Sequence, residues 1–103
     1  MNTHDELFKT VVDNYSTFKE VDYIYYNIKN KNNNNNDILF LIFINCDKYE
    51  HELQSNMIEK EINIEDMFDD MYLDFHYIPI KFVNKHHCID YDSHILYKRS
   101  KQI

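Results

Sequence analysis

The order of apolar and polar residues near the start of the chain has first the period of a helix and then that of a strand. Apolar residues recur at three- and four-residue steps and predict a helix over residues 4–18, opened by a capping box of Thr3 and Glu6. From residue 21 to residue 28, aromatic and β-branched side chains dominate, and they predict a first strand.

A polar stretch and then a wholly apolar run follow this strand. Residues 29–37 are nearly all Asn and Lys and have almost no apolar surface to bury, so we predict a mobile hairpin loop. Residues 38–44 are apolar at consecutive positions, which is typical of a strand covered on both faces, and we predict that they form the central strand. Their closeness in sequence favours antiparallel pairing of the two strands.

A second helical pattern follows Asp47 and Glu50, whose three-residue spacing repeats the capping signature. We predict a helix from about Lys48 into the early sixties. Its apolar stripe would consist of Tyr49, Leu53, Met57, Ile58 and either Ile62 or Ile64.

The pattern after this helix changes twice. Residues 64–70 predict a helix end or a short turn, with Met67 and Phe68 packed beneath it. Residues 71–82 predict a strand whose apolar parity switches at Pro79. Because proline cannot donate a ladder hydrogen bond, this strand should have a bulge there or lie at an edge of the sheet.

The last quarter of the chain predicts a loop over residues 84–93, a short strand over residues 95–97 and a basic tail over residues 98–103. The whole order predicts one α+β domain over residues 1–103. We expect a two-layer αββαβ(β) sandwich, with the helices packed on one face of a small mixed or antiparallel sheet.

The composition excludes several classes of function. The formal charge is −7, which argues against direct nucleic-acid binding, because phosphate recognition needs a cationic surface. Glycine is absent, and this excludes the P-loop, the dinucleotide fingerprint and the nucleophile elbow, which all need glycine at fixed backbone positions.

Several features predict a cytoplasmic protein without a membrane partner. Cys46 and Cys88 have no Cys-x-x-Cys spacing and cannot form the disulfide framework of a small secreted domain. The acidic N-terminal residues match neither a signal peptide nor a lipidation motif. The longest apolar run, residues 38–44, is far shorter than the ~20 residues of a membrane-spanning helix.

Acidic residues are concentrated in one part of the chain. Between Cys46 and Asp74, ten acidic residues are opposed by two lysines. Such a run is typical of the solvated face of a helix, but it also creates a negative field that speeds encounter with a basic partner. We therefore predict a partner-binding surface formed by Glu52, Glu59, Glu61, Glu65, Asp66, Asp69 and Asp70.

Two further groups of residues could carry chemistry. The possible ligands of zinc or another transition metal are His76, His86, Cys88 and His94. Their spacing matches no standard ligand pattern, and a solvated polar loop is the alternative. Asp74 and His76 should project from one face of their strand and could form an acid/base pair. Alternatively, Asp74 pairs with Lys81, Lys98 or Arg99.

Most of the chain resembles small uncharacterised bacterial proteins, and its layout is similar to a shortened nucleotidyltransferase domain. The resemblance is carried by residues 18–25, 37–44, 59–61, 73–79 and 95–99. It implies Gly-Ser after the first strand and two acids on the second strand that hold Mg²⁺. Here Tyr25-Tyr26-Asn27 stands in the first place, and only Asp37 precedes the apolar run. The resemblance therefore implies that two-metal chemistry is lost and that a binding role remains.

Three hypotheses for the function follow. The first is a small acidic, non-enzymatic regulator or inhibitor of the immunity, antitoxin or anti-defence type, which needs no cofactor and binds a basic toxin, nuclease or defence enzyme. The second is a degenerate nucleotidyltransferase-like component, with a nucleotide bound near Asp37. The third is a metal-dependent hydrolase that uses His76, His86, Cys88 and His94.

The tyrosine-rich first strand also predicts an oligomeric state. If it forms an edge of the sheet, it can pair with a second copy of itself and make a homodimer with a continuous sheet. A bulge or the Asn-rich loop could instead cover this edge.

Overall fold

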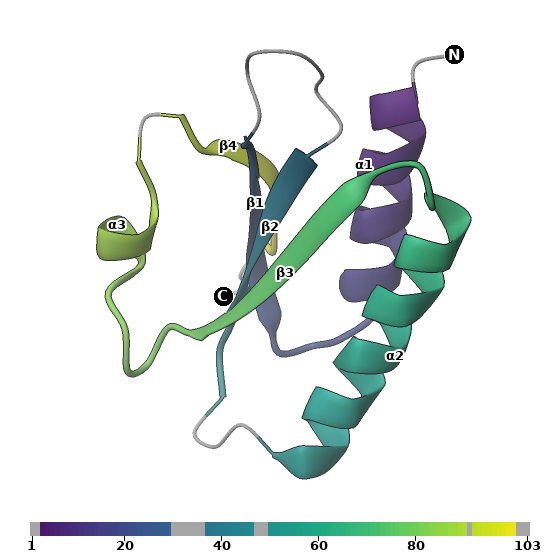
Figure 1. The fold of residues 1–103 in the computed structure, drawn as a ribbon. Helices are drawn as coiled ribbons and strands as arrows, with labels where there is room; N and C mark the ends of the chain where they lie inside the picture. Colours follow the sequence, from purple (N-terminus) through teal and green to yellow (C-terminus); the bar gives the residue numbers. More distant parts are fainter. Residues whose placement is uncertain (1–2, 30–36, 47–49, 91, 101–103) are drawn as a thin grey trace.

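The computed structural model describes residues 3–29, 37–46, 50–90 and 92–100. Within them the elements follow the order α1 (Thr3–Tyr15), β1 (Val21–Ile28), β2 (Asp37–Ile44), α2 (His51–Met67), β3 (Tyr72–Pro79), α3 (Lys85–Cys88) and β4 (His94–Lys98). The predicted α+β class is confirmed: one domain contains a four-stranded mixed sheet with the two long helices packed against it (Figure 1).

The strand order is β3-β2-β1-β4. The predicted antiparallel pairing of β1 with β2 is confirmed, and so is the internal place of β2. β3 pairs parallel with β2 across the helical connection α2, as parallel neighbours require. β4 returns to pair antiparallel with β1. β1 is therefore internal, so the condition for a homodimer through this strand is not met, and an edge-strand homodimer would have to use β3 or β4.

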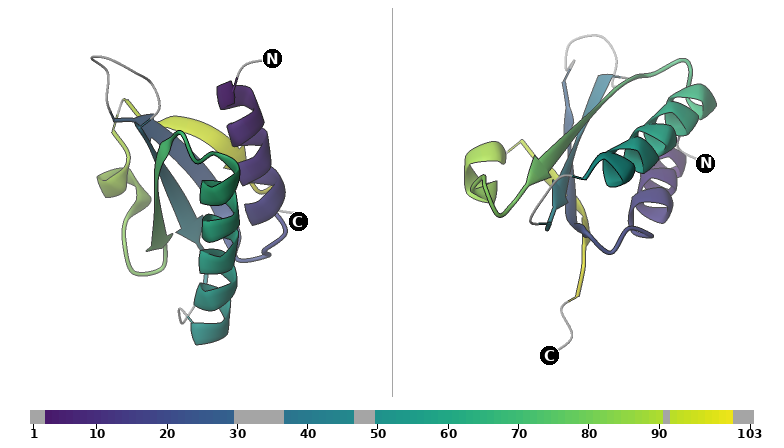
Figure 2. Two further views of the ribbon diagram at one scale, coloured as in Figure 1. Left: turned by 45° about the vertical axis from the view of Figure 1, so that its right-hand side comes forward. Right: turned by 90° about the horizontal axis from the view of Figure 1, so that it is seen from below.

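The long helices α1 and α2 lie side by side on one face of the sheet, and α3 lies on the other (Figure 2). The main core is between the long helices and the sheet. Its fully buried residues include Leu7, Val11, Tyr15, Phe40, Ile42, Met57 and Ile64. The rings of Phe40 and Phe75 stack there with their centroids 5.1 Å apart.

β2 is covered on both faces, as its apolar run predicts. Phe40 and Ile42 face the helices, whereas Leu41 and Phe43 alternate with them on the opposite face and are also buried. On that face, the ring of Phe43 meets the rings of Tyr23 and Tyr25 edge-on.

Both long helices differ in extent from the prediction. α1 ends at Tyr15 because the chain turns there, with the Phe18 amide donating to the Tyr15 carbonyl. α2 begins at His51, and its N-cap residue Glu50 makes no side-chain capping bond, so the predicted start near residue 48 is wrong. Asp47 and Lys48 lie outside the described residues.

The end of α2 is longer than the pattern predicted. The helix continues to Met67 because Ile64 and Phe68 prolong the buried stripe that Met57 begins. Phe68 is buried, as predicted. Met67 is 62% exposed, so its predicted burial is wrong.

The edge position of the Pro79 strand is confirmed. β3 ends at Pro79, where the chain turns away from the sheet and the Phe82 and Val83 amides donate to the Pro79 carbonyl. The predicted loop over residues 84–93 contains the single turn α3, which Asn84 caps by accepting a bond from the His86 amide.

The structure describes only the ends of two other predicted segments, the Asn-rich loop and the C-terminal tail. Residues 30–36, the middle of the predicted Asn-rich loop, lie outside the described residues, but the Lys29 amide donates to the Asp37 carbonyl at the base of the hairpin. Lys98 belongs to β4, and Arg99 is bound to the fold, so the predicted tail does not begin at residue 98. Residues 101–103 lie outside the described residues.

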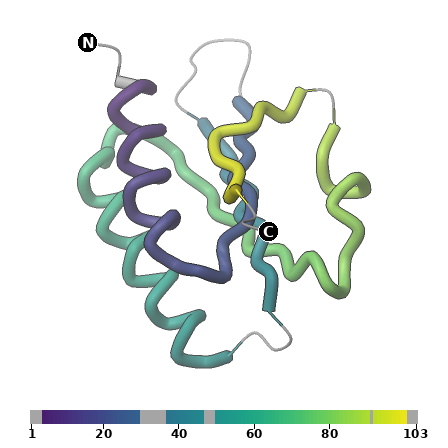
Figure 3. Tube along the Cα trace, turned by 180° about the vertical axis from the view of Figure 1, so that it is seen from behind, coloured from purple at the N-terminus to yellow at the C-terminus, as the bar shows by residue number. Residues whose placement is uncertain are grey.

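Arg99 fastens the end of β4 to the connection between α1 and β1. Its guanidinium donates to the carbonyls of Ser16, Phe18 and Val21 over 2.8–2.9 Å. Figure 3 shows how the C-terminal end of β4 lies close to this connection. One side chain therefore links the last strand to the α1–β1 connection, in addition to the pairing of β4 with β1.

Candidate functional site

The seven predicted partner-binding acids lie along α2 and in the turn that follows it. We call them the acidic face: Glu52, Glu59, Glu61, Glu65, Asp66, Asp69 and Asp70. Six are exposed, and Glu61 is half-buried. Within the described part of the chain, none of the seven forms an ion pair. Their negative charge is therefore not neutralised by basic side chains of those residues.

Helical geometry arranges the acids of α2 in two rows. An α-helix turns by about 100° per residue, so residues seven apart share a side. Glu52, Glu59 and Asp66 form such a row opposite the buried Met57. Glu61 and Glu65, four residues apart, form a second row on the side that faces β3.

An exposed apolar pair lies between the two rows. Ile58 and Ile62 are four residues apart and are 39% and 52% exposed. The sequence placed Ile58 in the buried stripe, and this is wrong because the inward side of α2 is defined by Met57, Ile64 and Phe68. Met57, Ile64 and Phe68 are spaced by seven and then four residues. This helical spacing could have identified Ile58 and Ile62 as lying outside the buried stripe.

Glu61 joins the acidic face to the core through two tyrosines. The Tyr77 hydroxyl lies 3.0 Å from Oε1 of Glu61 and 2.8 Å from the hydroxyl of the fully buried Tyr15. Both hydroxyls also lie 3.3 Å from the Met57 carbonyl. One consistent arrangement is a relay in which Tyr15 donates to Tyr77, and Tyr77 donates to Glu61.

The environment of this network favours its neutral forms. Partial burial raises the pKa of Glu61, and the negative charges of Glu65 and Asp74 raise it further, while the hydrogen bond from Tyr77 lowers it. Burial also raises the pKa of Tyr77 far above its usual value, so its phenol stays protonated and donates. Glu61 is thus partly a structural residue.

A surface hollow of about 360 Å³ lies between the end of α2 and β3. Glu65, Asp69 and Asp74 line it together with Tyr72, whose side chain is 73% exposed. The hollow extends the acidic face onto the β3 edge of the sheet.

The predicted acid/base pair is not assembled. Asp74 and His76 are both exposed and alternate with the buried Phe75, so their shared face is confirmed. Asp74, however, forms an ion pair with Lys29 at the end of β1. The predicted alternatives Lys81, Lys98 and Arg99 are therefore not its partners.

The four predicted metal ligands lie on three elements. His76 is on β3, His86 and Cys88 are on α3, and His94 is on β4. β3 and β4 are opposite edges of the sheet, three strand spacings or about 14 Å apart. Among the described residues, no group of three or more His, Cys, Asp or Glu side chains could hold a metal ion. Neither Cys46 nor Cys88 forms a disulfide bond.

Asp37, the one acid that precedes the apolar run, and Asp74 both act on Lys29. The pKa of Lys29 is raised mainly by its hydrogen bond to Asp74 and also by the charge of Asp37, which begins β2.

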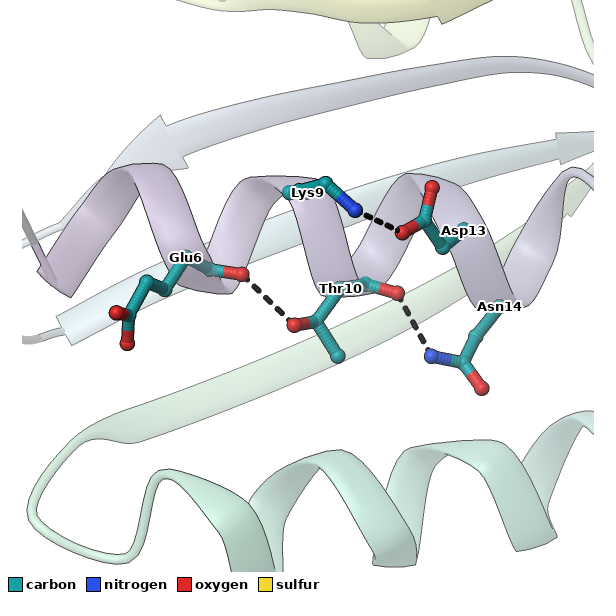
Figure 4. Close-up of polar contacts among 5 residues, drawn as sticks. All are labelled: Glu6, Lys9, Thr10, Asp13 and Asn14. Atoms are coloured by element: carbon teal, nitrogen blue, oxygen red, sulfur yellow. Dashed lines mark hydrogen bonds and ion pairs between the residues drawn. The ribbon is translucent and has the colours of Figure 1, made fainter.

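The polar side of α1 bonds mainly within its own helix. Lys9 donates to Asp13, Thr10 to the Glu6 carbonyl and Asn14 to the Thr10 carbonyl (Figure 4).

Comparison with known proteins found no matching family model, no matching curated protein and no matching solved structure. The resemblance to a nucleotidyltransferase domain stays a prediction. Among the described residues, no helix is both long and apolar enough to cross a membrane. The function must therefore be argued from the arrangement of the side chains of this chain.

Proposed function

We propose that the chain is a small, non-enzymatic regulator or inhibitor that binds a basic protein partner, such as a toxin, a nuclease or a defence enzyme, through its acidic face. One observation carries this proposal. The exposed pair Ile58 and Ile62 lies between two rows of carboxylates that have no ion-pair partner among the described residues.

An apolar centre with a charged surround is the arrangement that protein interfaces use. The two isoleucines supply apolar area that a partner can remove from water, and such contacts at the centre of an interface give most of its affinity. The surrounding carboxylates supply long-range attraction and orientation, which raise the association rate more than the final affinity. Neither feature requires a catalytic group.

The same surface favours a protein partner over a small ligand. On α2 the acids extend from Glu52 to Asp66, a length of about 21 Å along the helix, and Asp69 and Asp70 continue the surface into the turn before β3. A basic groove on another protein can cover such a length, whereas a metal ion or a metabolite cannot.

The proposal is tested by reversing charge in one row. The full chain is used to isolate its basic partner from the source cells, and the dissociation constant of the purified pair is measured at low and high salt. Glu59→Lys with Asp66→Lys should weaken binding at least tenfold at low salt and should flatten the salt dependence. Ile58→Ser with Ile62→Ser should weaken binding at both salt concentrations.

A matched control separates this effect from a change of net charge. Asp5 and Glu6 are exposed on α1, and reversing both changes the net charge by the same amount. This control should leave the affinity within about threefold of the native value, because Asp5 and Glu6 lie on α1 and are not part of the acidic face of α2. If the α1 reversal weakens binding as much as the α2 reversal, or if neither variant pair alters it, the proposal fails.

A further inference from the structure

The outer edge of β3 is an open row of backbone groups. β3 stands first in the strand order and pairs with β2 alone (Figure 1). In this parallel pairing the Ile80 amide donates to the Ile44 carbonyl of β2. Because the amides and carbonyls of successive residues in a strand point to opposite sides, those of Leu73 and Phe75 point away from β2. Within the described part of the chain, nothing bonds these outward groups of Leu73 and Phe75.

β3 lacks most of the features that protect an edge strand. Proteins usually protect such strands by making them short, by bulges or by lysine side chains. β4, at the other edge, has five residues, a register shift against β1 and Lys98. β3 has eight residues in continuous register and no lysine, and Pro79 protects only its last position. A long, regular edge of this kind is one to which an extended chain can add as a further strand.

Acidic side chains determine which kind of chain fits this edge. On the side of the helices, Glu65 and Asp69 line the hollow of about 360 Å³ together with Leu73, one of the residues with outward backbone groups. Neither acid forms an ion pair among the described residues, whereas Asp74, on the opposite face of β3, is paired with Lys29. The side chains of an added strand would alternate between these two faces. A basic residue at every second position would therefore meet the unpaired acids.

The same charges disfavour a second copy of this chain as the occupant. Two copies joined through their β3 edges would bring Glu65 and Asp69 of one close to the same residues of the other, and like charges across an interface are repulsive. Pairing β3 of one copy with β4 of the next is a head-to-tail contact, which does not close on itself in a two-fold dimer. The charges therefore favour a different, basic chain.

We propose that the outer edge of β3 binds an extended basic segment of another protein as an additional strand. The backbone groups of Leu73 and Phe75 supply hydrogen bonds, and the carboxylates of Glu65 and Asp69 attract lysine or arginine at every second position of the segment. This inference rests on the proposed function and deepens it, because it names the part of the basic partner that the chain takes. Such a segment is an exposed strand or an extended tail of the partner.

The test uses a peptide as long as β3, eight residues of alternating lysine and valine with blocked ends. It is titrated into the ¹⁵N-labelled full chain at low ionic strength and followed by NMR. The amides of Leu73 and Phe75 should shift in a saturable way, with a dissociation constant below about 1 mM, and their hydrogen exchange should slow by at least about tenfold. The amides of Asp74 and His76, which point to β2, should change little and serve as the internal reference.

Two control peptides and two pairs of substitutions separate backbone pairing from charge. A peptide with every backbone amide N-methylated keeps the charge but cannot donate, and one of alternating glutamate and valine reverses the charge; both should bind at least about tenfold more weakly. Glu65→Gln with Asp69→Asn should weaken binding of the lysine peptide about fivefold. Asp5→Asn with Glu6→Gln removes the same charge from α1 and should leave the affinity within about twofold. All four residues are exposed, so the variants should fold.

Several outcomes overturn the proposal. It fails if the lysine peptide does not saturate, if the N-methylated peptide binds as tightly, if binding leaves the exchange of Leu73 and Phe75 unchanged, or if the α1 variant loses as much affinity. It also fails if these two amides become protected in the unbound chain as its concentration rises, because a second copy then occupies the edge. Reversal of Glu59 and Asp66 tests the proposed function separately, so a partner that responds to that reversal keeps the proposed function even when this edge fails.

Discussion

The buried relay from Tyr15 through Tyr77 to Glu61 allows a sharp test of the packing between β3 and the long helices. Tyr77→Phe removes one hydroxyl and leaves the ring in place. The variant loses the 3.0 Å contact with Glu61, the 2.8 Å contact with the Tyr15 hydroxyl and the 3.3 Å contact with the Met57 carbonyl. No other atom of the core is removed.

The expected cost follows from what can replace each bond. A buried hydrogen bond to a charged group contributes about 1.5–3 kcal/mol, and a neutral one about 0.5–1.5 kcal/mol. Tyr15 can turn its hydroxyl to the Met57 carbonyl, 3.3 Å away, and water can reach the half-buried Glu61. The free energy of unfolding should therefore fall by about 1–2 kcal/mol at pH 7, which corresponds to a decrease in Tm of roughly 4–12 °C for a domain of this size.

The cost should depend on pH because Glu61 titrates. Partial burial raises the pKa of Glu61 in the folded state, and the bond from Tyr77 limits this rise. Without that bond, the folded pKa rises further. The folded state then binds a proton more strongly than the unfolded state, so stability is lost as the pH rises from the unfolded pKa through the folded one. The difference between native and Tyr77→Phe protein should be smaller near pH 4 than at pH 7.

Urea unfolding followed by circular dichroism at both pH values measures this difference. The matched control is Tyr72→Phe on the same strand, because Tyr72 is 73% exposed and its hydroxyl bonds no described residue. The control should change the free energy of unfolding by less than about 0.5 kcal/mol. The reasoning is refuted if Tyr77→Phe behaves like this control at pH 7, or if its effect is larger near pH 4.

Three further outcomes are expected. Arg99→Lys should reduce the free energy of unfolding by about 2 kcal/mol, because an ammonium cannot reach three carbonyls as the guanidinium does, whereas Lys98→Gln should cost less than about 0.5 kcal/mol in the same urea titration. Phe40→Ala should cost about 3–5 kcal/mol in thermal unfolding, since the ring is fully buried and stacks on another; a loss below about 1 kcal/mol would contradict this packing. Glu61→Gln should raise the urea midpoint at pH 7 and leave it unchanged near pH 4, because partial burial raises the pKa of Glu61 and disfavours its carboxylate, and a lower midpoint at pH 7 would contradict this reasoning.

Local patterns predicted most of the secondary structure and part of the topology. The consecutive apolar residues 38–44 identified a strand buried on both faces, and Pro79 identified an edge strand, because each follows from side-chain burial or backbone bonding within a few residues. Local patterns could not predict which strand pairs with β4. Tyr23 and Lys98 are 75 positions apart in sequence and directly opposed in the sheet, and no local pattern encodes that pairing.

The candidate sites show the same limit more strongly. The acidic face was predictable because exposed charge on one helix is a local property. The exposed position of Ile58 depends on which side of α2 meets the sheet, and this is decided by packing rather than by hydrophobicity alone. His76 and His94 were grouped by residue type, although the strand order places them at opposite edges. The bonds of Arg99 to three carbonyls have no signature in side-chain patterns.

The position of β4 also determines when the sheet can be completed during synthesis. β1 is made early, but the strand that covers one of its two sides is the last to leave the ribosome. Until then β1 presents an open row of backbone groups flanked by tyrosines, the kind of edge through which nascent chains aggregate. A chain that stops before His94 never closes this edge. Arg99 then stabilises the completed sheet, because it fixes the end of β4 to the carbonyls of Ser16, Phe18 and Val21.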